Sequence, residues 1–150
     1  MKRLTILFFT LVLIAGCSDP IKTDLAEYTR AIQPLTTTEA SVINRWNSVS
    51  GKSYVNDSYM YQALDDYIID TYSQFVDGLK KIKPQTNEVK SLNDLYIQAT
   101  EKQLQGYRMM KDGLEKRNKD IMNNAYKLLT DGRTEENNWA NQLESLLKKH

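Results

Sequence analysis

The chain has 150 residues, of which 41% are hydrophobic and 26% are charged, and its formal net charge is +1 at pH 7. This length suits one domain with its own core, and the balanced charge gives no case for binding nucleic acid. The sequence has one histidine and one cysteine, which excludes an imidazole-based metal site and an internal disulfide. We therefore expect neither a metal nor a cofactor.

The first 17 residues form three zones. Lys2 and Arg3 are positive, residues 4–14 are almost all apolar, and the small residues Ala15-Gly16 lead to Cys17. This order is typical of a secretory signal peptide. Its last four residues, Ile14-Ala15-Gly16-Cys17, resemble the lipobox of bacterial lipoproteins.

The resemblance implies that residues 1–16 are cleaved and that Cys17 receives a diacylglycerol and becomes the mature N-terminus. Residues 17–20 would then be a short lipidated tether and residues 21–150 the folded domain. The alternatives are a transmembrane helix, for which the apolar run is shorter than the required 20 or so residues, and a free thiol in a secreted protein. Cleavage leaves 18 basic and 19 acidic residues.

The expected location is the cell envelope. The lipid would anchor the protein to the outer face of the cytoplasmic membrane, or to the outer membrane in a cell with two membranes, because Ser18 rather than Asp follows Cys17. Two or more acyl chains give stable anchoring. A tether of three residues spans only about 10 Å, so we expect the domain to lie close to the head groups.

Four amphipathic segments follow, with apolar residues at alternating steps of three and four. The first covers residues 21–49, with Asp19 as N-cap and Pro20 in the first turn. Pro34 predicts a kink or a break near Gln33. Because the apolar stripe keeps its phase across the proline, a kinked or two-piece helix is favoured over two unrelated elements.

The second segment has its apolar stripe over residues 61–82, between Gly51, which ends the first helix, and Pro84, which ends the second. Any of residues 56–58 can cap it. The third follows Thr86 as cap and continues to Leu114.

The fourth segment covers residues 121–148 after a corner marked by Asn118 and Asp120. Gly132 is a potential C-cap inside it, but the stripe keeps its phase, so one long helix is favoured. Similar lengths and short connections predict an all-α fold, an antiparallel up-down four-helix bundle with a kinked first helix.

Catalytic patterns are missing from the sequence, and we expect no enzyme. His150 is the last residue, so Ser-His or Cys-His catalysis has no internal base. Neighbouring carboxylates such as Asp65-Asp66 and Glu135-Glu136 diverge by about 100° on a helix and cannot share a substrate.

Two groups of residues are candidates for binding. The connection around residues 54–61 is rich in aromatic residues and methionine, which are favoured at protein interfaces. In the predicted topology it lies far from the membrane, and its candidate partner-binding residues are Tyr54, Tyr59 and Tyr61. The alternative interpretation is that these rings only cap the core.

Small and polar residues on the apolar stripes form the second group. They would either set the register of the helices or leave a cavity for an apolar ligand. The candidate cavity residues are Ala99, Gln103, Gly106 and Gly132. Trp46 and Trp139, which also lie on their stripes, are expected in the core.

The run from Lys83-Pro84 through Glu88-Val89 to Gln103-Leu104 is similar to small helical lipoproteins of Gram-positive bacteria. This resemblance implies a fold rather than an activity. The leading hypothesis is a membrane-anchored, non-enzymatic module that binds an envelope protein or a peptide, as immunity and exclusion lipoproteins do. The alternative is a bundle that binds a small apolar ligand.

Overall fold

The structure is a computed structural model that describes residues 19–150. These residues are helical with no strand, which confirms the predicted all-α class. The predicted signal peptide, residues 1–16, and the predicted lipidation site Cys17 lie outside the described residues. The elements are α1 (Pro20–Asn47), the 3-10 turn η1 (Gly51–Ser53), α2 (Asp57–Ala63), the π-helical segment η2 (Leu64–Ile68), α3 (Ile69–Lys81), α4 (Asn87–Glu115) and α5 (Lys119–Lys149).

Helix α1 begins and continues for clear local reasons. Asp19 is the N-cap, and its carboxylate accepts a hydrogen bond from the backbone N–H of Ile21 at 2.9 Å, while Pro20 occupies the first turn. The helix then runs through Pro34 without a break. Of the alternatives left open by the sequence, the two-piece helix is therefore wrong.

Segment η2 joins α2 and α3 into one uninterrupted rod. Asn56 caps this rod by accepting a hydrogen bond from the N–H of Tyr59 at 2.9 Å. A π-helical turn holds more residues than an α-helical turn and therefore rotates the faces on either side of it. The periodicity of the sequence predicted the rod but not this insertion.

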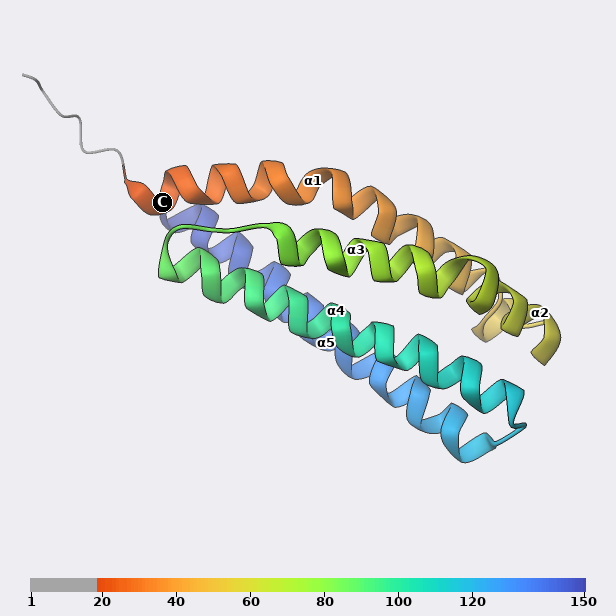
Figure 1. The fold of residues 1–150 in the computed structure, drawn as a ribbon. Coiled ribbons are helices and arrows are strands. Elements are labelled where there is room, and N and C mark those ends of the chain that lie inside the picture. The colour runs from red at the N-terminus through yellow and green to blue at the C-terminus, as the bar shows by residue number, and fades with distance from the viewer. Residues whose placement is uncertain (1–18) are drawn as a thin grey trace, which may run out of the picture.

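Helices α4 and α5 pack closely along their length and are joined at the corner around Asn118, which caps α5 (Figure 1). Glycines permit this approach: a Cβ atom at Gly106 would lie 2.8 Å from the Leu129 side chain, and one at Gly132 would lie 2.8 Å from the carbonyl oxygen of Ala99. Helix α5 continues through Gly132 without a split, as the stripe predicted.

The connection between α3 and α4 is tied to α1 by Asp24, a buried carboxylate. It accepts hydrogen bonds from the backbone N–H groups of Gln85 (2.9 Å) and Thr86 (2.7 Å) and from the Thr86 hydroxyl (2.7 Å). Burial acts to raise the pKa of Asp24, but these hydrogen bonds and nearby Lys90 outweigh it and lower the pKa. Thr86 is the N-cap of α4 as predicted, although its hydroxyl binds Asp24 instead of the helix.

The molecule has two distinct ends, which we call the base and the tip (Figure 1). The base is formed by the start of α1, the connection 82–86 and the end of α5, where His150 Nδ1 lies 2.5 Å from an Asp19 carboxylate oxygen. The tip is the opposite end, formed by residues 48–60 and the corner 116–118. Large aromatic residues fill the core between them, and the four fully buried tyrosines are Tyr28, Tyr72, Tyr96 and Tyr107.

Candidate functional site

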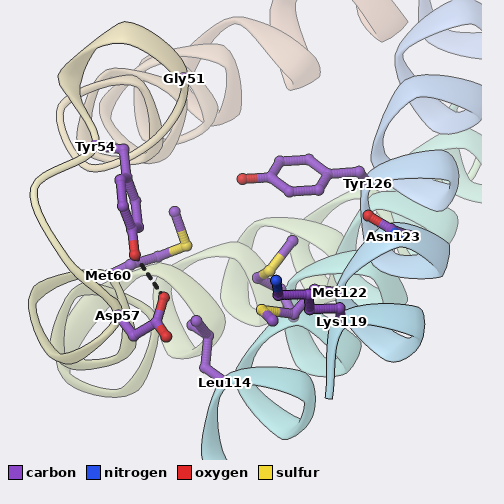
Figure 2. A pocket seen from close by; sticks show the side chains of 10 residues that line it. Gly51, Tyr54, Asp57, Met60, Leu114, Lys119, Met122, Asn123 and Tyr126 are labelled. Carbon is purple, nitrogen blue, oxygen red and sulfur yellow. Dashed lines mark hydrogen bonds between the residues drawn. The ribbon is translucent and has the colours of Figure 1, made fainter. Parts of the chain in front are cut away.

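A pocket of about 350 Å³ opens at the tip, between the segment after α1, the end of α4 and the start of α5 (Figure 2). We call it the tip pocket. It depends on the corner at Asn118, which brings the last turn of α4 and the first turns of α5 opposite residues 51–60. Its lining residues are Gly51, Tyr54, Asp57, Met60, Met110, Leu114, Lys119, Met122, Asn123 and Tyr126.

Methionine is the most frequent residue in the tip pocket. Met60 and Met110 are buried at its floor, and Met122 is half-buried beside them. Thioether side chains are flexible and polarizable, so they adapt to apolar groups of different shape. The floor therefore suits an apolar side chain or a small apolar molecule.

Two tyrosines and one carboxylate border the opening. Tyr54 and Tyr126 are 46% and 42% exposed, and Figure 2 shows both rings at the pocket. The Tyr54 hydroxyl donates a 2.6 Å hydrogen bond to Asp57, which raises the pKa of Tyr54. An apolar floor with a polar, aromatic rim is the arrangement expected of a site that binds an amphipathic group.

Of the three tyrosines predicted to bind a partner, only Tyr54 lines the tip pocket. Tyr59 lies under Arg45, with the guanidinium 5.4 Å from the ring centroid, and Tyr61 is approached by the Lys111 ammonium at 5.5 Å. Tyr59 remains 39% exposed. These rings are therefore at the predicted end of the molecule, but two of them are held by cations of α1 and α4.

The structure does not bring the four candidate cavity residues together around a void. Gly106 and Gly132 are filled by their neighbours across the α4–α5 contact, and Ala99 is fully buried there. Gln103 is also buried, and its amide donates a 2.8 Å hydrogen bond to Glu136. These small residues serve the close packing of α4 on α5, so the prediction of a cavity at this position is wrong.

A buried carboxyl group, that of Glu39, lies in the middle of the molecule. Glu39 is 6% exposed; one of its oxygens accepts a 2.7 Å hydrogen bond from the Tyr96 hydroxyl, and the other has no partner within residues 19–150. Burial, reinforced by the charge of Glu136, raises the pKa of Glu39 to about 7. The Tyr72 hydroxyl is likewise buried with no hydrogen-bond partner among these described residues.

The two tryptophans singled out in the sequence take part in packing, and carboxylates from the neighbouring pairs take part in ion pairs. Trp46 and Trp139 are buried, as predicted; Trp139 stacks on Tyr96 and donates to the Tyr28 hydroxyl at 3.2 Å. Asp65 and Asp66 are both exposed, and Asp65 pairs with Lys111 across to α4. Glu135 and Glu136 contact the adjacent residues Lys102 and Gln103 of α4. Within residues 19–150, no three acidic or histidine side chains gather in a way that could hold a metal ion.

The methionine floor and Asp24 were missed by the sequence reasoning. A signal for the floor was available, because Met110 and Met122 flank the corner at Asn118 and so face the same end of an antiparallel helix pair. Asp24 had no such signal, since its partners are backbone groups 61 and 62 residues away.

Residues 1–149 match the family model described as EMYY-motif containing lipoprotein. No curated protein and no solved structure gives a significant match to the chain. Among the helices of residues 19–150, none combines the length and the apolar character that crossing a bilayer requires.

Proposed function

The chain belongs to the family of EMYY-motif containing lipoproteins, and from this premise we propose that it is a membrane-anchored module that binds an envelope protein or a peptide at the tip pocket. The proposal treats α1, the rod α2–η2–α3, α4 and α5 as an up-down four-helix bundle in which α1 bends at Pro34. It assigns the lipid to Cys17, which lies two residues before Asp19 at the base, and it assigns no enzymatic activity.

The position of the tip pocket is the observation that carries the proposal. A lipid at Cys17 would hold the base against the membrane, because two extended residues span only about 7 Å. The residues that line the tip pocket belong to the opposite end of the long helices, and Figure 1 shows the two ends of the molecule far apart. The membrane would therefore leave this pocket open to a partner that approaches from outside.

The chemistry of the tip pocket favours an anchor side chain of a partner. Well-packed pockets that take one apolar or aromatic side chain contribute most of the energy in many interfaces. The methionine floor offers such a place, and the exposed rings of Tyr54 and Tyr126 add contact area at low entropic cost. Asp57 and Lys119 at the rim provide a charge of each sign.

Site-specific photo-crosslinking in native membranes tests this proposal. A photoreactive phenylalanine would replace Tyr54 in one variant and Tyr67 in a matched control, because Tyr67 is 38% exposed but lies in η2, outside the tip pocket. We expect a discrete adduct with one envelope protein or peptide from position 54 only. Equal adducts from both positions, or none from position 54, would contradict the proposal.

A small apolar ligand is the second candidate, supported by the pocket volume of about 350 Å³, which is within the usual range of roughly 300 to 1,000 Å³ for small-molecule sites. Mass spectrometry of the protein released intact from membranes distinguishes the two. A bound small molecule that is lost on substitution of Met110 by Gln would favour this candidate over a macromolecular partner.

A further inference from the structure

A second pocket, of about 540 Å³, lies near the base between α3, the connection 82–86 and α4. We call it the lysine pocket. It is separate from the tip pocket and has a different chemistry, because three of its lining side chains are lysines and only one is acidic. Its lining residues are Lys80, Ile82, Lys83, Pro84, Lys90, Asn93, Asp94 and Ile97.

Two of the three lysines form no ion pair among the described residues, although Lys90 lies near enough to Asp24 to lower the pKa of that carboxyl and Asp94 lines the same pocket. Lys80 forms an ion pair with Glu101, whereas Lys83 donates only to the carbonyl oxygen of Lys80, at 3.0 Å. Neither Lys83 nor Lys90 has an ion-pair partner within residues 19–150. Lysines outnumber carboxylates three to one in the lining, so the pocket favours an anion over a cation, and lysine ammonium groups are common phosphate ligands.

Asn93 adds an independent polar signal. Its side chain is 4% exposed, and its amide oxygen is buried with no hydrogen-bond partner in the described part of the chain. Buried acceptors are nearly always satisfied, so an unpartnered one in a pocket wall points to a donor supplied from outside. The pocket thus combines cations for an acidic group with an acceptor for a hydroxyl or an amine.

The location of the lysine pocket decides which anion can reach it. Asp24 ties the connection 82–86 to the first turns of α1, and α1 begins at the base, next to the end of α5 (Figure 1). A lipid anchor two residues before Asp19 would place this end at the membrane surface. Lipid head groups are then the most concentrated phosphates near Lys83 and Lys90.

We propose that the lysine pocket binds the head group of an anionic glycerophospholipid, with its phosphate at Lys83 and Lys90 and a head-group hydroxyl donating to the Asn93 amide oxygen. Phosphatidylglycerol has both groups. The inference rests on the lipid anchoring in the proposed function and is independent of the tip pocket. It gives the domain a second attachment point that fixes its orientation on the membrane.

The test uses the lipidated, processed protein in nanodiscs of phosphatidylcholine with or without phosphatidylglycerol. Lysine acetylation rates are read by mass spectrometry. We expect phosphatidylglycerol to slow labelling of Lys83 and Lys90 at least about fivefold, the shift that roughly 1 kcal/mol of contact energy gives. Lys22 and Lys149 are exposed residues at the base outside the pocket, and Lys52 at the tip serves as a distant reference.

Each outcome bears on the inference. Equal slowing of Lys22 and Lys149 would show attraction to a charged surface without a pocket and would overturn it, as would unchanged labelling of Lys83 and Lys90. Equal slowing by free glycerol phosphate in phosphatidylcholine discs would assign the site to a soluble phosphate instead. A protein that fails to remain in the disc fraction would contradict the anchoring itself, which is a separate result.

An Asn93→Leu variant completes the test. It keeps the branching and the number of heavy atoms of the side chain but removes the acceptor, so we expect the protection of Lys83 and Lys90 in phosphatidylglycerol to fall at least about twofold. Its acetylation pattern in phosphatidylcholine reports whether the fold is retained. Protection that is unchanged in this variant would remove Asn93 from the proposed site.

Discussion

The base and the tip of the molecule are held together in different ways. At the base, Asp24 joins α1 to the connection 82–86 through backbone hydrogen bonds, and Asp19 meets His150. At the tip, the contacts are rings, thioethers and exposed polar pairs such as Tyr54 with Asp57, around an open pocket. This division fits the proposed function, in which the anchored end keeps its orientation while the free end adapts to a partner.

The strongest test of the fixed base is Asp24→Ala. The substitution removes the acceptor for the N–H groups of Gln85 and Thr86, and unpaired buried donors are costly. We expect the free energy of unfolding, measured by urea denaturation at pH 7, to fall by about 3 kcal/mol. Because the folded pKa of Asp24 is lowered, this contribution is present above the ordinary carboxyl pKa and is lost in acid.

Asp65→Ala is the matched control nearer the tip. Asp65 forms an exposed ion pair with Lys111, and exposed pairs contribute about 0 to 1 kcal/mol. A loss at Asp65 as large as that at Asp24 would remove the contrast between the two ends.

The buried carboxylate between the two ends gives the next effect. Since the folded pKa of Glu39 is raised to about 7, the folded state holds the Glu39 proton more tightly than the unfolded state. The contribution of Glu39 to the unfolding free energy should therefore be largest below the ordinary pKa of 4.5, fall as the pH rises through about 7, and then level off.

Glu39→Gln keeps an acceptor for the Tyr96 hydroxyl and removes the buried charge. We expect this variant to be more stable than the natural protein at pH 8 by roughly 2 kcal/mol, and to lose this advantage near pH 4. Thermal denaturation across this pH range measures the difference. A variant that is less stable at pH 8 would show that the charge of Glu39 is needed in the core.

Close packing of α4 on α5 is tested by Gly132→Ala. The new methyl group would meet the backbone of Ala99 and Gln103, which cannot rotate away. We expect a net loss of about 1 to 2 kcal/mol, even though alanine favours helix.

Gly78→Ala is its control, because there the methyl group meets only the end of the flexible Leu35 side chain. That variant should be neutral or slightly stabilised in the same denaturation experiment. Equal losses at both positions would contradict the packing explanation.

Local sequence patterns predicted the helices well because their causes are local. Asp19, Asn56 and Asn118 mark helix starts by rules that involve only a few neighbouring residues. The stripe also predicted continuity through Gly132. What it could not predict was the role of that glycine, since a small residue on a stripe allows either a cavity or a close approach, and the partner helix decides.

The candidate site was predicted only in part for the same reason. The aromatic connection identified the tip and Tyr54, because its composition differs from the rest of the chain. The pocket itself needs Met110 from α4 and Tyr126 from α5. Tyr59 instead contacts the guanidinium of Arg45 from α1. Such pairings depend on the angles between helices, which the π-helical segment η2 alters without any signal in the apolar periodicity.

The most direct test of the tip as the binding end is photo-crosslinking from position 54 in a Met122→Lys background. Lysine has the unbranched shape of methionine and places a charge at the apolar floor. We expect the adduct to disappear while the protein remains folded and in the membrane. An adduct of unchanged yield would contradict the assignment of partner binding to the tip pocket.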